Sequence, residues 1–226
     1  MKRLVLMILS MGLCFAELSV DTQEKKFDVG FFVGGGIGIG ANAMQYNNVS
    51  NSSGGLYEQN QSFASFVASV KVGAYHYFTP TLGLRAYYNL DLNVLPLDEY
   101  GTAEGTFTPY VLSTSHTINA DVIYNVFSHN NIDVAVIGGM GLGALAGESM
   151  AKSGSVYYKN SSIGDGFLDF EFRLNIGARA MLSKKYGVEF MAKIPVTPAT
   201  MIIKDGNKNI KYSPYYFTID FVMEKF

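Results

Sequence analysis

The sequence predicts an all-β fold: an eight-stranded antiparallel up-and-down transmembrane β-barrel. Apolar residues alternate with glycine or polar residues at a period of two, which is typical of strands with one apolar face. Charged residues make up only 16% of the chain, whereas it holds 24 Gly, 15 Tyr and 16 Phe. Beyond residue 16 no apolar stretch is long enough for a spanning helix, so strands must make any membrane crossing.

The N-terminus has the pattern of a secretory signal peptide. The charged pair Lys2-Arg3 precedes an apolar run from Leu4 to Leu13, and the small residue Ala16 marks a cleavage site. A membrane anchor is the less favoured alternative, because a spanning helix needs about 20 apolar residues. We expect residues 1–16 to be a signal peptide and residues 17–226 to form the barrel. The single cysteine, Cys14, leaves with the signal, which excludes disulfides and zinc-cysteine sites in the mature chain.

Eight segments carry the alternation. The clearest is 167–182, where Phe170, Phe172 and Leu174 alternate with Glu171 and Arg173. The predicted strands are 27–43, 62–78, 82–92, 110–127, 132–145, 167–182, 186–196 and 215–226.

The connections alternate between short and long. Short turns are expected near residues 80, 129 and 184, and long polar segments at 44–61, 93–109, 146–166 and 197–214. In outer-membrane barrels short turns are periplasmic and long loops extracellular. Both termini therefore belong in the periplasm.

The same alternation also fits a soluble barrel of the lipocalin type, with its apolar face inward. Low charge content, a less apolar face made largely of glycine and serine, and aromatic residues near strand ends favour the membrane. The predicted periplasmic girdle is Tyr75, Tyr77, Phe78, Phe127, Tyr186 and Phe226, and the extracellular girdle is Phe63, Phe66, Tyr110, Phe167, Tyr215 and Phe217.

In a membrane barrel the charged face must look inward, because Arg or Lys at the lipid midplane costs about 2–4 kcal/mol. Buried charges need partners. A tight turn near residue 184 sets Arg179 opposite Glu189, and we expect them to form an ion pair. The interior of an eight-stranded barrel is just wide enough for side chains, which predicts a plugged lumen. The predicted lumen network is Lys71, Arg85, Asp121, Glu171, Arg173, Arg179, Glu189, Lys193 and Asp220; Asp91, Asp133, Asp169 and Glu224 are further inward candidates.

No catalytic constellation appears. His116 shares its strand face with Thr114 and Ile118 and with no serine, and the glycine run 34–40 lacks the spacing and helix of a dinucleotide fingerprint. No metal-ligand spacing is present. A net charge of −2 does not suggest nucleic acid as a partner. We therefore expect a protein that is not an enzyme and has no cofactor or metal.

Three segments in order resemble the Helicobacter outer-membrane protein family, whose members include adhesins and porins: Gly83–Tyr88, Asp121–Phe127 and Tyr186–Pro195. The long N-terminal domain of the larger adhesins is not present in this sequence. The terminal Phe226 would be the signal that the barrel-assembly machinery reads. It is out of phase with Phe217 and Phe221, which predicts a bulge near residues 224–225.

These observations predict a monomeric integral protein of a Gram-negative outer membrane with a structural or surface-interaction role. A small porin, or an adhesin acting through the extracellular loops, is the alternative. The expected partners are outer-membrane lipid and the assembly machinery, with a host-surface ligand in the adhesin case.

Overall fold

The computed structural model describes residues 29–50, 56–96, 100–102, 105–129, 132–153, 156–159, 166–183, 185–203 and 208–225. The predicted signal peptide and Phe226 lie outside the described residues. No helix in the described ranges is long and apolar enough to cross a membrane.

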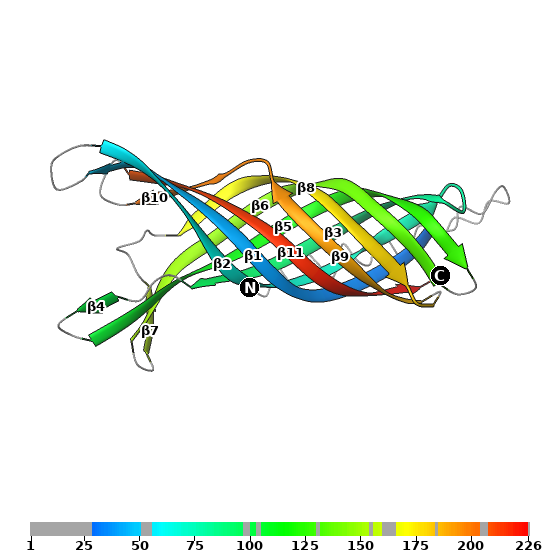
Figure 1. Cartoon of the computed structure of the whole chain (residues 1–226), viewed down its shortest axis with the longest axis horizontal. Helices are drawn as coiled ribbons and strands as arrows, with labels where there is room; N and C mark the ends of the chain where they lie inside the picture. Colours follow the sequence, from blue (N-terminus) through cyan, green and yellow to red (C-terminus); the bar gives the residue numbers. More distant parts are fainter. Residues whose placement is uncertain are drawn as a thin grey trace, which may run out of the picture.

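Eight long strands close into one tilted antiparallel barrel (Figure 1). Each strand pairs with the next in the chain, and the last pairs with the first, so the predicted up-and-down barrel is confirmed. Three short strands, β4 (Tyr100–Thr102), β7 (Val156–Lys159) and β10 (Ala199–Ile203), lie at one end. The barrel strands are β1 (Val29–Ser50), β2 (Leu56–Tyr77), β3 (Leu82–Pro96), β5 (Gly105–His129), β6 (Ile132–Ser153), β8 (Phe167–Met181), β9 (Tyr186–Pro195) and β11 (Lys208–Lys225).

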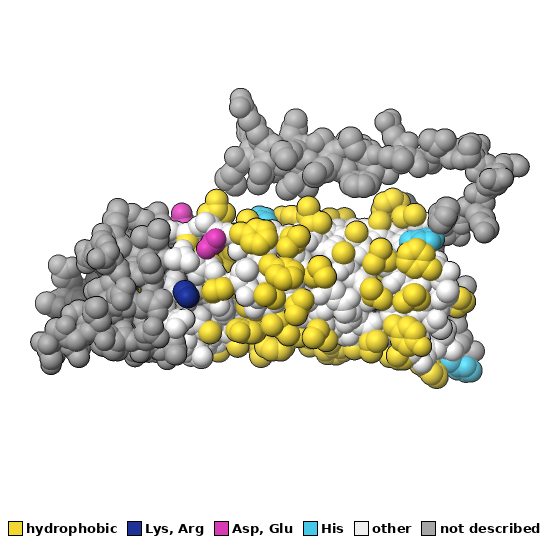
Figure 2. All heavy atoms as spheres, turned by 90° about the horizontal axis from the view of Figure 1, so that it is seen from above, with side chains coloured by type: hydrophobic (Ala, Val, Ile, Leu, Met, Phe, Trp, Pro, Cys, Tyr) yellow, Lys and Arg dark blue, Asp and Glu magenta, His cyan; other side chains and the backbone are white. Residues whose placement is uncertain are grey.

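The period-two pattern separates the two faces of the wall. Ile39 is 67% exposed and Ile118 is 68% exposed, although both are large and apolar, while inward polar residues such as Asn119 are buried. Figure 2 shows hydrophobic side chains over the middle of the barrel and the Lys, Asp and Glu side chains of this face at one end. The outward face is therefore the surface that meets lipid.

The strand ends agree with the three predicted short turns near residues 80, 129 and 184. In the first turn the Thr79 hydroxyl accepts a hydrogen bond from the Leu82 amide at 3.0 Å. The opposite ends differ from the prediction, because β1 continues to Ser50, β2 begins at Leu56 and β6 continues to Ser153. The predicted loops 44–61, 93–109, 146–166 and 197–214 were thus drawn too wide. Beyond the membrane a strand faces water and loses the apolar alternation, so its sequence looks like a loop.

The strands are much longer than the membrane requires. With a rise of about 3.4 Å per residue and a tilt of about 45°, the 25 residues of β5 span about 60 Å along the barrel axis. The apolar band of an outer-membrane barrel is about 25 Å tall. A large part of the barrel therefore stands outside the membrane.

Four of the predicted girdle aromatics point inward, so that part of the girdle assignment was wrong. Tyr75 and Tyr77 have the same parity as Lys71 on β2, and Phe167 has the parity of Glu171 on β8. Phe63 packs against a buried cluster at the end where the strands are longest, which is the predicted extracellular end. The other described members of the two girdles face outward: Phe66, Phe78, Tyr110, Phe127, Tyr186, Tyr215 and Phe217. Phe127 does so because the register of β5 shifts by one residue between Asn125 and Phe127.

The bulge predicted near residues 224–225 is wrong. β11 pairs with β1 without a register shift as far as Lys225, opposite Phe31. Glu224 keeps the inward parity of Asp220 and is buried. Inside the lumen Glu224 contacts Arg179, as described below. The strand therefore keeps its alternation of inward and outward residues up to Glu224.

Two strands line the lumen with glycine. β1 contributes Gly36 and Gly38, and β6 contributes Gly139 and Gly141; in the closed strand order β1 and β6 lie on opposite sides of the barrel. A Cβ added at Gly36 would lie 2.1 Å from Asp220 Oδ1. These glycines leave the space that longer side chains from the other strands occupy.

This account predicts opposite outcomes for two neighbouring glycines. A Cβ at Gly139 would lie 2.1 Å from Asp121 Oδ1, whereas a Cβ at Gly138, on the lipid face, has no atom within 4 Å. Gly139→Ala is expected to lower the free energy of unfolding by about 1–3 kcal/mol through overpacking. Gly138→Ala is the matched control and should cost nothing. Urea titration of the refolded barrel in lipid vesicles, followed by the gel shift between folded and unfolded forms, measures both; equal effects would contradict the packing argument.

Candidate functional site

The structure places all nine side chains of the predicted lumen network inside the barrel. Each is at most 4% exposed. Asp91 and Glu224 join them, which gives five cations and six carboxylates in one interior. Asp133 and Asp169 do not: both are half-buried near strand ends, where Asp133 accepts a hydrogen bond from Ser128 and Asp169 accepts one from the Thr200 amide.

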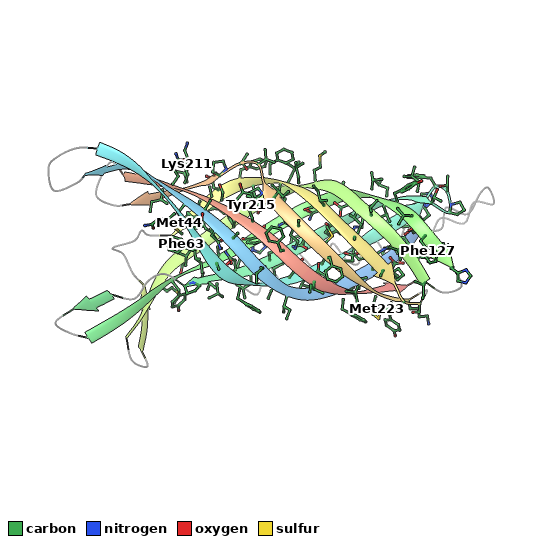
Figure 3. All side chains as sticks on the ribbon, in the orientation of Figure 1. Met44, Phe63, Phe127, Lys211, Tyr215 and Met223 are labelled. Atoms are coloured by element: carbon green, nitrogen blue, oxygen red, sulfur yellow. The ribbon has the colours of Figure 1, made fainter. Side chains whose placement is uncertain are left out.

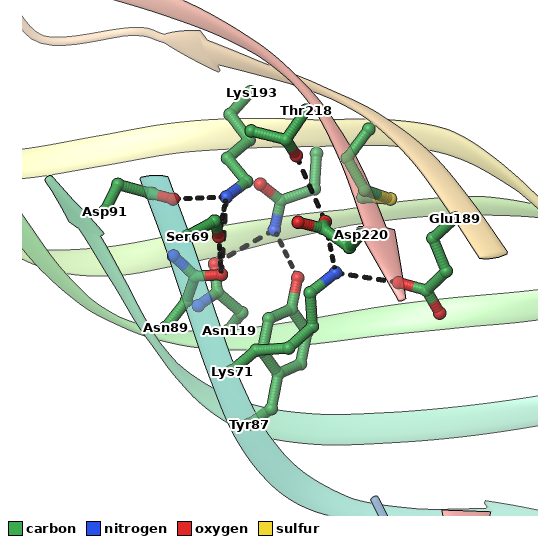
Figure 4. A network of polar contacts seen from close by, with 12 residues as sticks. Ser69, Lys71, Tyr87, Asn89, Asp91, Asn119, Glu189, Lys193, Thr218 and Asp220 are labelled. Carbon is green, nitrogen blue, oxygen red and sulfur yellow. Dashed lines mark hydrogen bonds and ion pairs between the residues drawn. The ribbon is translucent and has the colours of Figure 1, made fainter. Parts of the chain in front are cut away.

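The upper part of the network is built around Asp91 on β3. Its two carboxylate oxygens lie 2.5 Å from Lys193 Nζ and 2.7 Å from Arg173 Nη1. Lys193 comes from β9, on the opposite side of the closed strand order, and also donates to Ser69 at 2.9 Å (Figure 4). Glu171 accepts a short hydrogen bond from Ser115 and lies 3.8 Å from Arg173. These contacts brace one wall against the other.

The lower part is built around Glu189 on β9. Its oxygens lie 2.7 Å from Lys71 Nζ and 2.5 Å from Arg85 Nη1. Lys71 also lies 2.8 Å from Asp220 (Figure 4), and Arg85 donates through Nε at 3.0 Å and Nη2 at 2.9 Å to Asp121. Lys71 and Arg85 thus each contact two carboxylates, and these contacts offset part of the cost of removing the charges from water.

An aromatic platform orients Arg85. Its guanidinium lies 4.8 Å from the Tyr87 ring centroid and 5.5 Å from that of Phe32, within the range of cation–π contacts. The Tyr87 hydroxyl donates to Asp121 at 2.8 Å. Tyr87 therefore holds both the cation and its carboxylate.

The predicted Arg179–Glu189 ion pair is wrong, although the register behind it is right. The two residues are direct cross-strand partners on β8 and β9. Arg179 instead lies 2.5 Å from Glu224 and donates a short hydrogen bond to the Tyr77 hydroxyl. Glu189 is occupied by two cations from across the lumen, so adjacency on the sheet does not decide the partner.

Apolar side chains close the charged layers at the predicted extracellular end. A cluster that we call the upper cap consists of Met44, Leu95, Val111, Leu145, Phe167, Ala199, Ile210 and Tyr212. Just below it the Tyr212 hydroxyl donates to Asn42 at 2.7 Å and accepts from Asn93 at 2.6 Å. Two smaller apolar clusters, one around Ile123 and one around Phe32, lie in the periplasmic half. Sequence reasoning missed the upper cap, although its members have the same strand parity as buried polar residues such as Asn93 and Ser113.

The site shows no arrangement for acyl transfer at His116. Its Nδ1 lies 2.6 Å from the Tyr88 hydroxyl on the outer wall, with ordinary aromatic contact between the rings. Within the described ranges, no group of three or more His, Cys, Asp or Glu side chains could hold a metal ion. What the lumen does chemically is to neutralise charge across a narrow interior.

A comparison with known protein families identifies the family of this chain. A family model described as Helicobacter outer membrane protein matches residues 69–224, which spans β3 to β9 completely, the last part of β2 and nearly all of β11. The chain belongs to this family. It is an outer-membrane β-barrel protein. No curated protein sequence matches it significantly.

Solved outer-membrane proteins have a similar overall arrangement. OprG from Pseudomonas aeruginosa is 12% identical with a TM-score of 0.49, covering 91% of this chain and 99% of that one. Neisserial surface protein A is 10% identical with a TM-score of 0.40, covering 85% and 96%. Ail of Yersinia pestis, the attachment invasion locus protein, is 9% identical with a TM-score of 0.34, covering 84% and 97%. At these scores nothing about function is transferred.

The corrected pairing of Arg179 is testable by two double-mutant cycles. The cycle of Arg179→Met with Glu224→Gln should give a coupling energy of about 1–3 kcal/mol, since the two side chains form a buried ion pair. The cycle of Arg179→Met with Glu189→Gln should give a smaller value. Unfolding free energies in lipid vesicles supply both, and a larger coupling to Glu189 would restore the pair that the register first suggested.

Proposed function

We propose that this outer-membrane protein is a non-conducting barrel that presents extracellular strand hairpins for surface interaction. The observation that carries the first half is the ion-pair network, in which Asp91 and Glu189 each bind cations from across the lumen. A passing ion would have to displace these contacts. Breaking one buried pair costs about 3–5 kcal/mol, and the network holds several in succession.

A second barrier supports the proposal. The upper cap lies between the charged layers and the extracellular mouth, and Leu95 and Val111 in it are fully buried. A hydrated ion entering there would have to shed its water, and the apolar side chains provide no hydrogen bonds or charges to replace it. The two barriers act in series, so loosening either one leaves the other in place.

Planar bilayer recordings test the closed lumen. We expect no steady conductance steps after insertion of the purified wild-type protein, while a porin reconstituted in the same way shows them. Insertion is checked by recovering folded protein from the bilayer-forming vesicles. Steady steps that scale with protein concentration would overturn the proposal in favour of the small-porin alternative.

The second half of the proposal is carried by strand length. β1, β2 and β6 have 22 residues and β5 has 25, against the 9–11 or so that a tilted transmembrane strand needs. The strand pairs β1–β2 and β5–β6 therefore continue above the membrane as hairpins. Long hairpins on a rigid base suit recognition of another surface, which makes adhesion the specific form of this role.

Adhesion predicts the effect of shortening one hairpin. Replacing residues 151–164 by a short glycine-rich turn should abolish binding of cells that display the protein to host cells or matrix. The cut spares Gly147 and Phe167, which are both buried and register partners, so the barrel should keep its gel shift. Replacing Asn130 and Asn131, which connect the paired His129 and Ile132 at the other end of the barrel, by two glycines serves as the control. Unchanged binding after the 151–164 replacement would count against this hairpin as the adhesive element.

A further inference from the structure

We propose that the outer wall along the β1–β11 seam binds one phosphorylated, acylated sugar lipid of the outer leaflet. Its acyl chain would lie in an apolar groove on the wall, and its phosphate would contact Lys211 above that groove. The proposal concerns the outside of the barrel and does not depend on whether the lumen conducts.

The apolar groove is a hollow of about 700 Å³. Ile39, Phe66, Phe190 and Phe217 line its sides, and the small Ala192 lies directly opposite Phe217 in the β9–β11 register. Alanine between large side chains leaves a depression in an otherwise full apolar surface. An acyl chain that enters it contacts side chains on several sides and not on one flat face.

A second, smaller hollow lies above the groove along the same two strands. It has a volume of about 290 Å³ and is lined by Ala43, Gln45, Gln61, Ser62, Lys211 and Ser213, with Met44 and Pro198. Along the seam Phe217 pairs with Ile39 and Ser213 pairs with Ala43. The two hollows are thus four residues apart on each strand, about 13 Å. This separation suits a lipid whose headgroup and chain occupy one each.

Lys211 supplies the charge. Its side chain is exposed and points away from the barrel (Figure 3). Among the described residues no carboxylate lies within ion-pair distance of it, and the carboxylate of Asp169 is engaged by the backbone amides of Phe170 and Thr200. Tyr215 lies between the two hollows on the same outward face of β11, where aromatic residues mark the membrane interface. Lys211 therefore sits at headgroup height without a carboxylate partner in the part of the chain that the structure describes.

The lining distinguishes among lipids. An acyl chain alone would need only the groove, and a simple phospholipid would need the groove and Lys211. The upper hollow adds Gln45, Ser62 and Ser213, which both donate and accept hydrogen bonds as sugar hydroxyls do. The hollow also lies on the side of the membrane where the strands extend, which is the outer leaflet. An acylated sugar phosphate satisfies all of these groups at once.

The test is native mass spectrometry of the full-length mature protein, purified in mild detergent and titrated with a bisphosphorylated, hexa-acylated glucosamine disaccharide. We expect one bound molecule, held about fivefold more weakly by Lys211→Gln, the ratio for a contact of about 1 kcal/mol. Ala192→Phe should weaken binding severalfold by filling the groove. Lys185→Gln at the periplasmic turn and Ala144→Phe on β6 are the matched controls and should bind as the wild type does. The gel shift verifies that each variant is folded.

Three further probes identify the occupant. The same disaccharide without phosphates should bind about fivefold more weakly to the wild type and equally to Lys211→Gln. Phosphatidylglycerol should bind more weakly than the glycolipid, and equal binding would overturn the sugar lipid as occupant. Displacement by millimolar inorganic phosphate would show a free-anion site and overturn the lipid proposal. If Ala144→Phe and Ala192→Phe weakened binding equally, the groove would not be the site of the acyl chain.

Discussion

The constraint on which the structure depends is that a charge inside a narrow barrel has no bulk water to solvate it. Each of the five buried cations therefore contacts at least one carboxylate. Neighbouring strands are already joined by their backbone ladders, but these side chains join strands that are not neighbours. Lys193 and Asp91 are 102 residues apart in sequence and meet at 2.5 Å. The cross-section of the barrel is thus fixed from within as well as around its wall.

That constraint explains the glycine content of two strands. Long side chains from β2, β3, β8 and β9 meet in the middle only if β1 and β6 contribute little volume. Gly36 beside Asp220 and Gly141 beside Asn119 leave less than the space of one Cβ. Glycine is a poor strand former, because it packs nothing and loses the most entropy on folding. Glycine at these positions leaves room for the charged side chains to reach one another and form the ion pairs.

How far the sequence could predict this molecule follows from the same geometry. Side-chain direction depends only on parity along a strand, so the nine lumen charges and the facing of Arg179 and Glu189 were accessible. Parity also indicates that Tyr75 and Phe167 point inward. The prediction overlooked this because it assigned aromatic residues to the girdles by their distance from the strand ends. Partners across the lumen were not accessible: they depend on stagger and on side-chain reach, so Glu189 pairs with Lys71 and Arg85 and not with its neighbour.

The apolar and the polar face of the barrel wall change places at the membrane boundary. Within the apolar belt the outside carries residues such as Ile39 and the inside carries charges. Above it the outside carries Gln45 and Lys211, while the inside is the upper cap around Leu95. The end that we predict to be extracellular therefore has the apolar interior and polar exterior of a soluble barrel, whereas the membrane-spanning part has a polar interior and an apolar exterior. Because the upper cap buries apolar side chains inside the barrel above the charged layers, this end has an apolar core of its own that does not involve lipid.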